Sequence, residues 1–176
     1  MGASVTFEEK LHEAWEDIQQ SIRHQMVSRA YRGANELRNA SQLVLRGARH
    51  GRRYIIPGTG RVTYYKRDSK DGKHKAGTAT ITYKRYTASA PGEPPAVRFG
   101  TFRASWQPKV YVDHTNGYAV VSQIESTQRT DNGKYLLGEI LEYGSPGGKI
   151  APRPHHDKIK QKALPAIMKI YNEPYV

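Results

Sequence analysis

Residues 1–50 carry a helical pattern that constrains the fold more than any other feature of the chain. Thr6-Phe7-Glu8-Glu9 has the spacing of a capping box, in which the Thr6 hydroxyl and the Glu9 carboxylate each bind a backbone amide. Apolar or small side chains then recur every three or four residues as far as Val44, and Gly47 is positioned to end the helix. A helix of about 40 residues is about 60 Å long, so we expect either a break near Gly33 or a helix that packs on neighbouring subunits.

Residues 52–87 change to the period of two that is typical of β-strands. β-Branched and aromatic residues fill the runs 54–56, 62–65 and 78–83, and a polar tip with an Asp71-Gly72 turn signal separates the last two runs. We therefore predict a long β-hairpin with a cationic end. Its candidate contacts with DNA or with a protein partner are the basic residues Arg61, Lys66, Arg67, Lys70, Lys73, Lys75, Lys84 and Arg85.

The net charge is concentrated in one segment of the chain. Residues 46–109 hold 15 Lys or Arg against 3 acids, a net charge of +12, and the remaining residues hold 13 basic and 13 acidic side chains. This concentration indicates a polyanionic neighbour or an acidic protein partner, and the alternative is a solvated loop whose lysines only keep it in solution. Tyr64, Tyr65, Tyr83 and Tyr86 lie among these cations, where their rings either stack on nucleic-acid bases or pair across strands whose edges the lysines protect.

Three prolines and two glycines within residues 89–100 oppose both a helix and a central strand. We therefore predict that residues 88–106 form an ordered connector or an extended arm. Because we expect the backbone of this segment to have few hydrogen-bond partners inside the subunit, we also predict that it is ordered only in an assembly, held by neighbouring subunits.

Residues 107–176 predict a small sheet followed by short helices. Two antiparallel strands are expected at 107–112 and 118–124, joined by a turn with an Asn-Gly signal, and a further turn is expected at 131–133. A short helix at 134–143 ends at Gly144, and the apolar positions of a last helix are Ile159, Ala163, Ile167 and Ile170. Pro165 is expected to kink that last helix or to limit it to short pieces.

Together these patterns predict a single α+β domain over residues 1–176, in which a long N-terminal helix and a C-terminal helix pack on a small antiparallel sheet. An extended basic β-hairpin and a proline-rich arm complete this fold. Apolar residues make up only 37% of the chain, and the mean hydropathy is −0.75, so we expect segments that are extended or covered by partners. We expect no membrane span and no secretory signal, since neither pattern occurs in the sequence.

The sequence offers little catalytic or metal-binding chemistry. Cysteine is absent, which excludes disulfides, thiolate zinc sites and cysteine nucleophiles. His155-His156-Asp157 could supply a base or metal ligands, but adjacent residues do not share a helical face and no second carboxylate or histidine cluster supports them. We interpret them as a surface histidine pair at a helix start. Phosphate-binding loops, nucleophile elbows and metalloprotease motifs are missing, so we predict no enzymatic activity, no metal and no cofactor.

Two pairs of motifs resemble one protein family. Residues 89–95 read SAPGEPP and residues 100–106 read GTFRASW, which together resemble the segment "SAPGEPPA…TG-x-L-R-x-S-I" of the neck, or head–tail joining, proteins of tailed bacteriophages. Residues 141–144 read LEYG and residues 151–154 read APRP, which resemble a second signature of that family, an apolar-Glu-aromatic-Gly turn before an "A-x-RP" or "PRP" segment that opens the last helix. The family is also described as connector, tail-completion or minor tail component proteins.

The two signatures occur in the family's order and at about its separation, and the resemblance covers residues 89–173. The family usually has an aromatic residue where this chain has His155 and a threonine where it has Phe99. The residues that carry the motifs are Pro91, Gly92, Pro94, Pro95, Gly100, Arg103, Ser105, Glu142, Tyr143, Gly144, Pro152, Arg153 and Pro154.

The resemblance implies a structural virion protein of a tailed phage, made in the host cytoplasm and located at the head–tail interface. Such a subunit forms a ring of six or twelve copies, with six favoured, between the portal, adaptor or head-closure protein and the tail terminator or tail tube protein. Packaged DNA passes through the ring, so the basic hairpin either contacts DNA nonspecifically or docks on an acidic protein partner. The alternatives are a basic nucleic-acid-binding protein of a different class and a nuclease with an unrecognised site.

Overall fold

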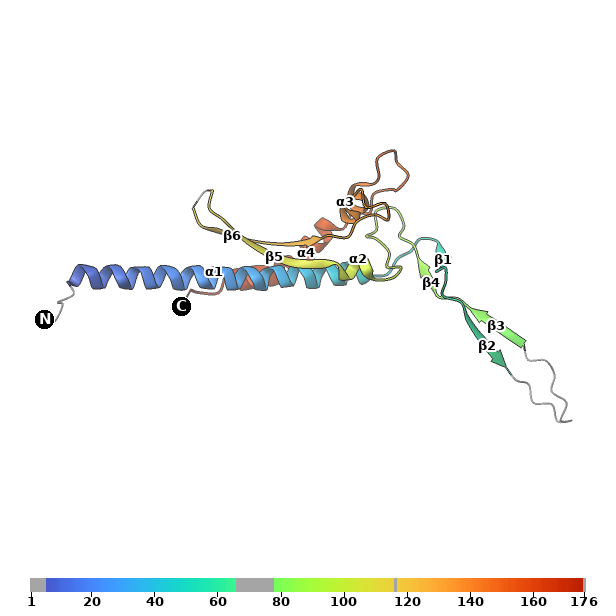
Figure 1. The fold of residues 1–176 in the computed structure, drawn as a ribbon, viewed down its shortest axis with the longest axis horizontal. Coiled ribbons are helices and arrows are strands. Elements are labelled where there is room, and N and C mark those ends of the chain that lie inside the picture. Colours follow the sequence, from blue (N-terminus) through green and yellow to red (C-terminus); the bar gives the residue numbers. More distant parts are fainter. Residues whose placement is uncertain (1–5, 66–77, 116, 176) are drawn as a thin grey trace.

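The computed structural model describes residues 6–65, 78–115 and 117–175 and shows an elongated molecule of helices and two-stranded antiparallel sheets (Figure 1). This is the predicted α+β class, with a long N-terminal helix and a helix at the C-terminus. In chain order the elements are α1 (Phe7–Arg46), β1 (Arg53–Ile55), β2 (Arg61–Tyr65), β3 (Thr78–Thr82), β4 (Arg85–Thr87), α2 (Thr101–Ala104), β5 (Trp106–Asp113), β6 (Ala119–Ser126), α3 (Leu137–Tyr143) and α4 (His156–Tyr171).

The long helix α1 begins as predicted and is unbroken over its 40 residues. The Thr6 N–H donates to Glu9 Oε2 at 2.7 Å and the Glu9 N–H donates to Thr6 Oγ1 at 3.4 Å, which confirms the capping box. The break expected near Gly33 is wrong. A Cβ at Gly33 would lie 3.2 Å from the Tyr171 ring, so this glycine instead lets the end of α4 approach α1 closely.

The core lies between α4 and the C-terminal half of α1. Ala40, Ile159 and Ala163 are buried there, and the half-buried side chains Leu37, Val44, Ile124 and Ile167 pack against them. The apolar positions predicted for the last helix therefore face this core, and Ile170 is buried as well. The division of α4 at Pro165 is wrong, because α4 continues through that exposed proline as one helix.

Strands β5 and β6 form an antiparallel ribbon along α1, in a register that runs from Trp106 opposite Ser126 to Asp113 opposite Ala119. The predicted strands are confirmed and are slightly longer than expected. Asn116 of the expected turn lies outside the described residues. The turn at 131–133 is confirmed by a hydrogen bond from the Gly133 N–H to Thr130 O at 2.7 Å. Helix α3 begins at Leu137, three residues later than predicted.

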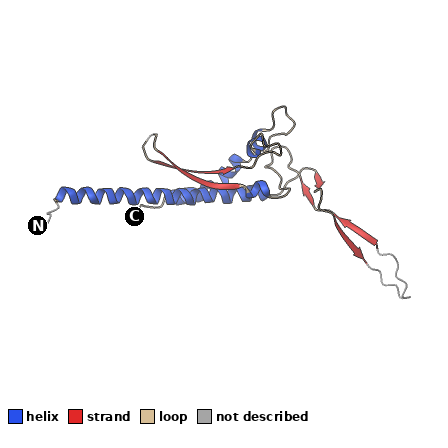
Figure 2. Cartoon of the chain, viewed as in Figure 1, coloured by secondary structure: helices blue, strands red, loops and turns tan. Residues whose placement is uncertain are grey.

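The predicted basic hairpin is present as two consecutive antiparallel ladders, β1 with β4 and β2 with β3 (Figure 2). Residues 56–60 interrupt the ladders on one side. There the Thr59 hydroxyl donates to Ile56 O at 2.6 Å and accepts the Lys84 N–H at 3.1 Å, so the two ladders remain joined. The hairpin extends away from the rest of the molecule, and the polar tip at 66–77 lies outside the described residues.

The last residues of the chain return to the middle of α1. Arg32 forms an ion pair with Glu173, and the Arg29 guanidinium donates to Pro174 O at 2.6 Å and lies 3.8 Å from the Tyr175 ring centre. The hydrogen bonds from Arg32 lower the pKa of Glu173. These contacts fasten the C-terminal residues to the middle of α1.

Candidate functional site

The proline-rich segment is bound within the subunit, contrary to the prediction that its backbone has few internal partners. The Ser89 hydroxyl donates to Pro94 O at 2.6 Å, and Pro94 and Pro95 are buried. Arg49 donates to Pro95 O at 3.1 Å, and Lys158 of α4 donates to Gly92 O at 2.8 Å. Prolines lack an N–H but keep their carbonyls as acceptors, so cationic side chains from outside the segment hold it in place.

A carboxylate inside the segment ties it to the chain that leaves α1. Glu93 accepts hydrogen bonds from the Ala90 N–H at 2.8 Å and the His50 N–H at 3.1 Å, and it lies 2.6 Å from Nδ1 of the His50 ring. These contacts, the bond with the His50 ring foremost, lower the pKa of Glu93 to about 2. Glu93 is therefore ionised at neutral pH and holds the connector against residues 50–51.

The end of the connector forms the short helix α2, which the prolines and glycines of residues 89–100 did not predict. Gly100 precedes α2 with φ of 86°, a left-handed conformation that favours glycine. After α2, the Ser105 hydroxyl contacts Ser126 Oγ at 2.6 Å and thereby joins α2 to the end of β6. Helix formation resumes here because the last proline of the segment is five residues before Gly100.

Arg153 connects the two motif pairs that are far apart in the sequence. Its N–H donates to Leu141 O at 2.6 Å, and its guanidinium donates to Ser89 O at 2.8 Å. Gly144 has φ of 89°, and a Cβ there would lie 2.9 Å from Ile150 O, so only glycine fits this turn. The SAPGEPP, LEYG and APRP segments thus meet in one place, which we call the motif junction and define as residues 89–106 and 141–155.

His155 is a buried member of the motif junction and not the surface histidine that we predicted. Its ring is fully buried and makes edge-to-face contacts with Phe102 and Trp106, at centroid distances of 5.8 and 5.9 Å. Burial lowers its pKa, so the ring is neutral at neutral pH. The imidazole ring therefore takes the place of a third aromatic ring in this cluster.

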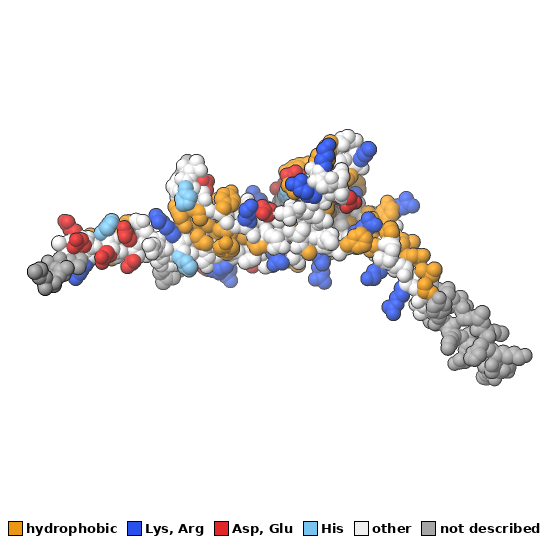
Figure 3. All heavy atoms as spheres, in the orientation of Figure 1, with side chains coloured by type: hydrophobic (Ala, Val, Ile, Leu, Met, Phe, Trp, Pro, Cys, Tyr) orange, Lys and Arg blue, Asp and Glu red, His pale blue; other side chains and the backbone are white. Residues whose placement is uncertain are grey.

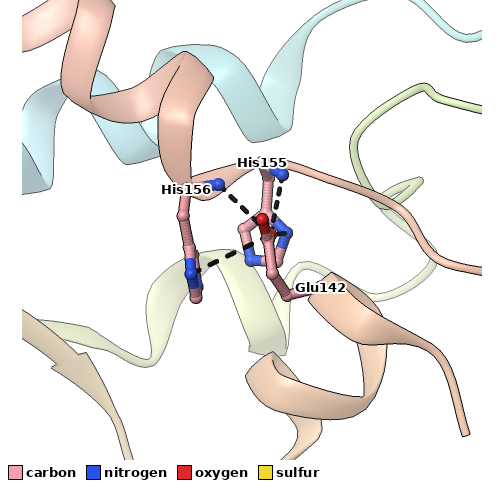
Figure 4. Close-up of side chains that lie close together, drawn as sticks. All are labelled: Glu142, His155 and His156. Atoms are coloured by element: carbon pink, nitrogen blue, oxygen red, sulfur yellow. Dashed lines mark hydrogen bonds and ion pairs between the residues drawn. The ribbon is translucent and has the colours of Figure 1, made fainter.

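Glu142 caps the N-terminus of α4 from a distant element (Figure 4). One oxygen of Glu142 accepts the N–H groups of His155 at 2.8 Å and His156 at 3.2 Å, and it also lies 2.8 Å from His155 Nδ1. His155 Nδ1 is in addition 2.9 Å from Arg153 O, which assigns the proton of the neutral ring to Nδ1. The negative carboxylate stabilises the positive end of the helix dipole.

Glu142, His155 and His156 are the residue types of a metal site, and one ligand atom from each lies within 4.8 Å of the others. The prediction that no carboxylate supports the histidines is therefore wrong, because Glu142 lies close to them in the fold although it is distant in the sequence. Glu142 already binds two backbone N–H groups, and His155 Nδ1 already binds a carbonyl. Helix capping accounts for the cluster, and we assign it no metal. Sequence reasoning missed it because 13 residues separate Glu142 from His155.

The remaining motif residues divide into covered and exposed positions. Arg103 of α2 is half-buried, whereas Tyr143 is 74% exposed and its ring lies edge-to-face to the His156 ring at a centroid distance of 6.5 Å. Exposed positions of the motifs are Pro91, Gly92, Pro152 and Pro154. Contacts within the subunit therefore account for the positions of most of the motif residues.

The structure describes three of the eight candidate contact residues of the hairpin. Arg61, Lys84 and Arg85 are exposed, whereas Lys66, Arg67, Lys70, Lys73 and Lys75 lie outside the described residues. Tyr54 and Tyr86 stack across β1 and β4 at 5.8 Å, so Tyr86 pairs across strands, and Tyr83 is 43% exposed. Lys and Arg side chains project from this end of the molecule, and carboxylates gather at the other end, where α1 begins (Figure 3).

The chain matched no protein-family model, no curated protein and no solved structure. Among the described residues, no helix combines the length and apolar character needed to cross a membrane. The motif junction and the exposed surfaces are therefore the basis for a functional proposal.

Proposed function

We propose that this chain is a structural subunit of the neck of a tailed bacteriophage and that it forms a ring of six or twelve copies, six favoured, around the DNA channel. The observation that carries the proposal is the motif junction. The segments that resemble the neck family lie far apart in the sequence, and Arg153 joins them through Ser89 O and Leu141 O. Independent chance matches to the two signatures would not be expected to build one unit.

The form of the molecule supports a role as a subunit of an assembly. A single copy leaves large apolar side chains uncovered at both ends, on the first turns of α1 and on the hairpin, where Val62 and Ile81 face each other and are 45 and 53% exposed. Extended apolar surfaces of this kind mark contacts with partners. Under this proposal neighbouring copies, the portal, adaptor or head-closure protein, and the tail terminator or tail tube protein cover them.

The exposed cations Arg61, Lys84 and Arg85 fit either of two contacts in such a ring. They contact the phosphates of DNA in the channel, or they dock on an acidic protein of the neck. Replacing all three with glutamine separates these roles, because each phosphate contact contributes about 0.9 to the slope of log affinity against log salt. Loss of that slope supports DNA contact, whereas an unchanged slope with failed joining to the neighbouring neck protein supports the protein contact.

The oligomeric state tests the proposal as a whole. Light scattering after size-exclusion chromatography and negative-stain imaging of the purified chain are expected to show closed rings of six or twelve copies. A monomer that binds DNA tightly by itself would contradict the neck assignment and favour a basic nucleic-acid-binding protein of another class. Cleavage of plasmid DNA that depends on an added divalent metal would favour a nuclease.

A further inference from the structure

The first four turns of α1 have a large apolar face that stays exposed beside all the residues that the structure describes. Phe7, Leu11, Trp15, Ile18 and Ile22 are 80, 61, 58, 51 and 37% exposed and recur at helical spacing. Among the hydrogen bonds, ion pairs and ring contacts of the described residues, the first that joins α1 to another element is Arg23 above the Tyr118 ring, at 5.3 Å. We call residues 7–22 the free segment of α1.

The free segment is strongly acidic. It contains five carboxylates and a single lysine, Lys10, and its acids are Glu8, Glu9, Glu13, Glu16 and Asp17. At 100° per residue, Glu8 lies beside the apolar face and Asp17 towards its other flank, whereas Glu9, Glu13 and Glu16 lie on the opposite face. A surface that covers the apolar face is therefore favoured when it offers apolar contacts with positive charge at its rim, close to the acidic flanks of the helix.

A groove with this character lies at the other end of α1. It has a volume of about 520 Å³ and lies between the C-terminal end of α1, residues 95–103, α3 and residues 150–153. Its lining contains the apolar side chains of Phe99, Leu137 and Ile150. Three arginines and no carboxylate line it, and the arginines are Arg98, Arg103 and Arg153.

One copy cannot fill its own groove with its own free segment. Ile22 ends the free segment and Leu45 lines the groove, and both belong to the same unbroken helix. The separation of 23 positions between them corresponds to about 35 Å of rigid helix. A second copy has no such restriction, and one that presents its free segment to this groove leaves its own groove open for a third.

We propose that the free segment of one copy docks in the groove of the next copy, with Leu11, Trp15 and Ile18 as its apolar anchors and with Glu8 and Asp17 at its flanks near Arg98 and Arg103. The contact joins two different surfaces, so repeating it gives a closed ring when the rotation between copies closes, as the proposed function requires. The inference rests on the proposed ring, for which it names the interface between subunits.

Disulfide cross-linking tests this interface directly because the chain contains no cysteine. Ala14 is exposed beside the anchors and Ala96 lines the groove, so Ala14→Cys and Ala96→Cys leave the apolar side chains in place. Mixing the two variants under mild oxidation is expected to give a cross-linked dimer of one copy of each. Lys160→Cys, exposed on α4, is the control and is expected to cross-link with neither.

Each other result overturns the inference in a recognisable way. Cross-linking of Ala14→Cys with itself but not with Ala96→Cys would show two free segments pairing symmetrically. Rings that assemble without the mixed cross-link would place the interface elsewhere and leave the proposed function intact. A chain that remains monomeric at every concentration would overturn both the inference and the ring.

A matched pair of substitutions gives an independent measure. Trp15→Ala removes the largest anchor, and Gln20→Ala changes an exposed position on the opposite face of the same helix. We expect Trp15→Ala to raise the concentration at which rings dissociate by about tenfold or more, as for a central interface residue. Gln20→Ala is expected to change it by less than about twofold. Equal effects of both, or no effect of Trp15→Ala, would contradict the inference.

Discussion

The two halves of α1 belong to one helix but differ in the size and the surroundings of their apolar residues. From Arg29 to Leu45 the buried face consists mainly of small residues, among them Ala30, Gly33, Ala34 and Ala40. The free segment carries Phe, Leu, Trp and Ile, and these are exposed. The half with the larger apolar side chains is therefore the half that the subunit leaves uncovered.

This difference reflects two kinds of contact. Small residues allow α4 and the β5–β6 ribbon to approach the α1 backbone closely, as Tyr171 does at Gly33, where Ser122 Oγ also hydrogen-bonds Ala30 O at 2.7 Å. Large residues are suited to filling a groove on a separate molecule, where each anchor contributes buried area. The stability of the subunit is therefore expected to depend on the second half of α1, whereas the exposed side chains of the first half contribute little to it.

The largest effect is expected from removing Leu45, the largest apolar side chain that the covered half of α1 buries. Leu45 is 1% exposed, so Leu45→Ala is expected to lower the free energy of unfolding by about 2–4 kcal/mol through lost burial and a residual cavity. Leu43→Ala makes the same chemical change on a side chain that is 56% exposed and serves as the control, with an expected loss below about 1 kcal/mol. Urea unfolding measures both. Similar losses would mean that burial within the subunit does not distinguish these two positions.

The cap on α4 is expected to have a smaller effect. Glu142→Ala leaves the N–H groups of His155 and His156 without their acceptor, which is expected to lower the free energy of unfolding by about 1–2 kcal/mol. Glu139→Ala, on the exposed side of α3, is the matched control. A loss for Glu142→Ala no greater than for the control would show that the motif junction does not depend on this cap.

His155 is expected to make the covered region sensitive to pH, with an effect that grows as the solution is acidified. Its pKa is lowered in the folded chain because the ring is buried, although the nearby Glu142 opposes this shift. The unfolded chain therefore binds a proton more readily, so stability is full above the ordinary value of about 6.5 and falls as the pH drops below it. Unfolding curves between pH 8 and 5 measure the slope, which His155→Phe is expected to reduce.

The neighbouring histidine provides the control for that slope. The charge of His156 is one of the causes that lower the pKa of His155, so His156→Phe is expected to reduce the slope by less than His155→Phe, which removes the buried imidazole itself. If His155→Phe and the parent chain lose stability in parallel between pH 8 and 5, the buried imidazole is not the source of the sensitivity.

The smallest effect is expected in the free segment. Trp15→Ala is expected to change the free energy of unfolding of dispersed subunits by less than about 0.5 kcal/mol, since the ring is 58% exposed and has no partner in the core. Circular dichroism of a dilute sample follows this unfolding. A loss of unfolding free energy comparable to that of Leu45→Ala would contradict the proposed difference between the two halves of α1.

Local signals in the sequence predicted the elements well. The capping box at Thr6, the alternation in β5 and β6, the apolar positions of α4 and the glycine after α3 each depend on residues a few positions apart. Gly33 was misjudged because a glycine inside a helix costs only about 1 kcal/mol, less than close packing at that point recovers.

The motif junction depends on contacts that no local pattern contains. Arg153 and Ser89 are 64 residues apart, and Arg49 and Pro95 are 46 apart. The missing N–H groups of the prolines predicted few internal partners, but the carbonyls of the segment accept hydrogen bonds from other elements, Pro95 O from Arg49 and Gly92 O from Lys158. His155 was placed on the surface because no carboxylate or histidine cluster near it in the sequence supports a site, and only the aromatic cluster of Phe102 and Trp106 accounts for its burial.

The return of the C-terminal residues to α1 sets an order of events during synthesis. Arg29 and Pro174 are 145 residues apart, and Arg32 and Glu173 are 141 apart, so the middle of α1 obtains these contacts only after those later residues have been synthesised. At ribosomal rates that delay is on the order of ten seconds. During that interval the nascent α1 offers both its faces to chaperones and to other nascent chains, and the covered half becomes distinct from the free one only once its later partners have been added.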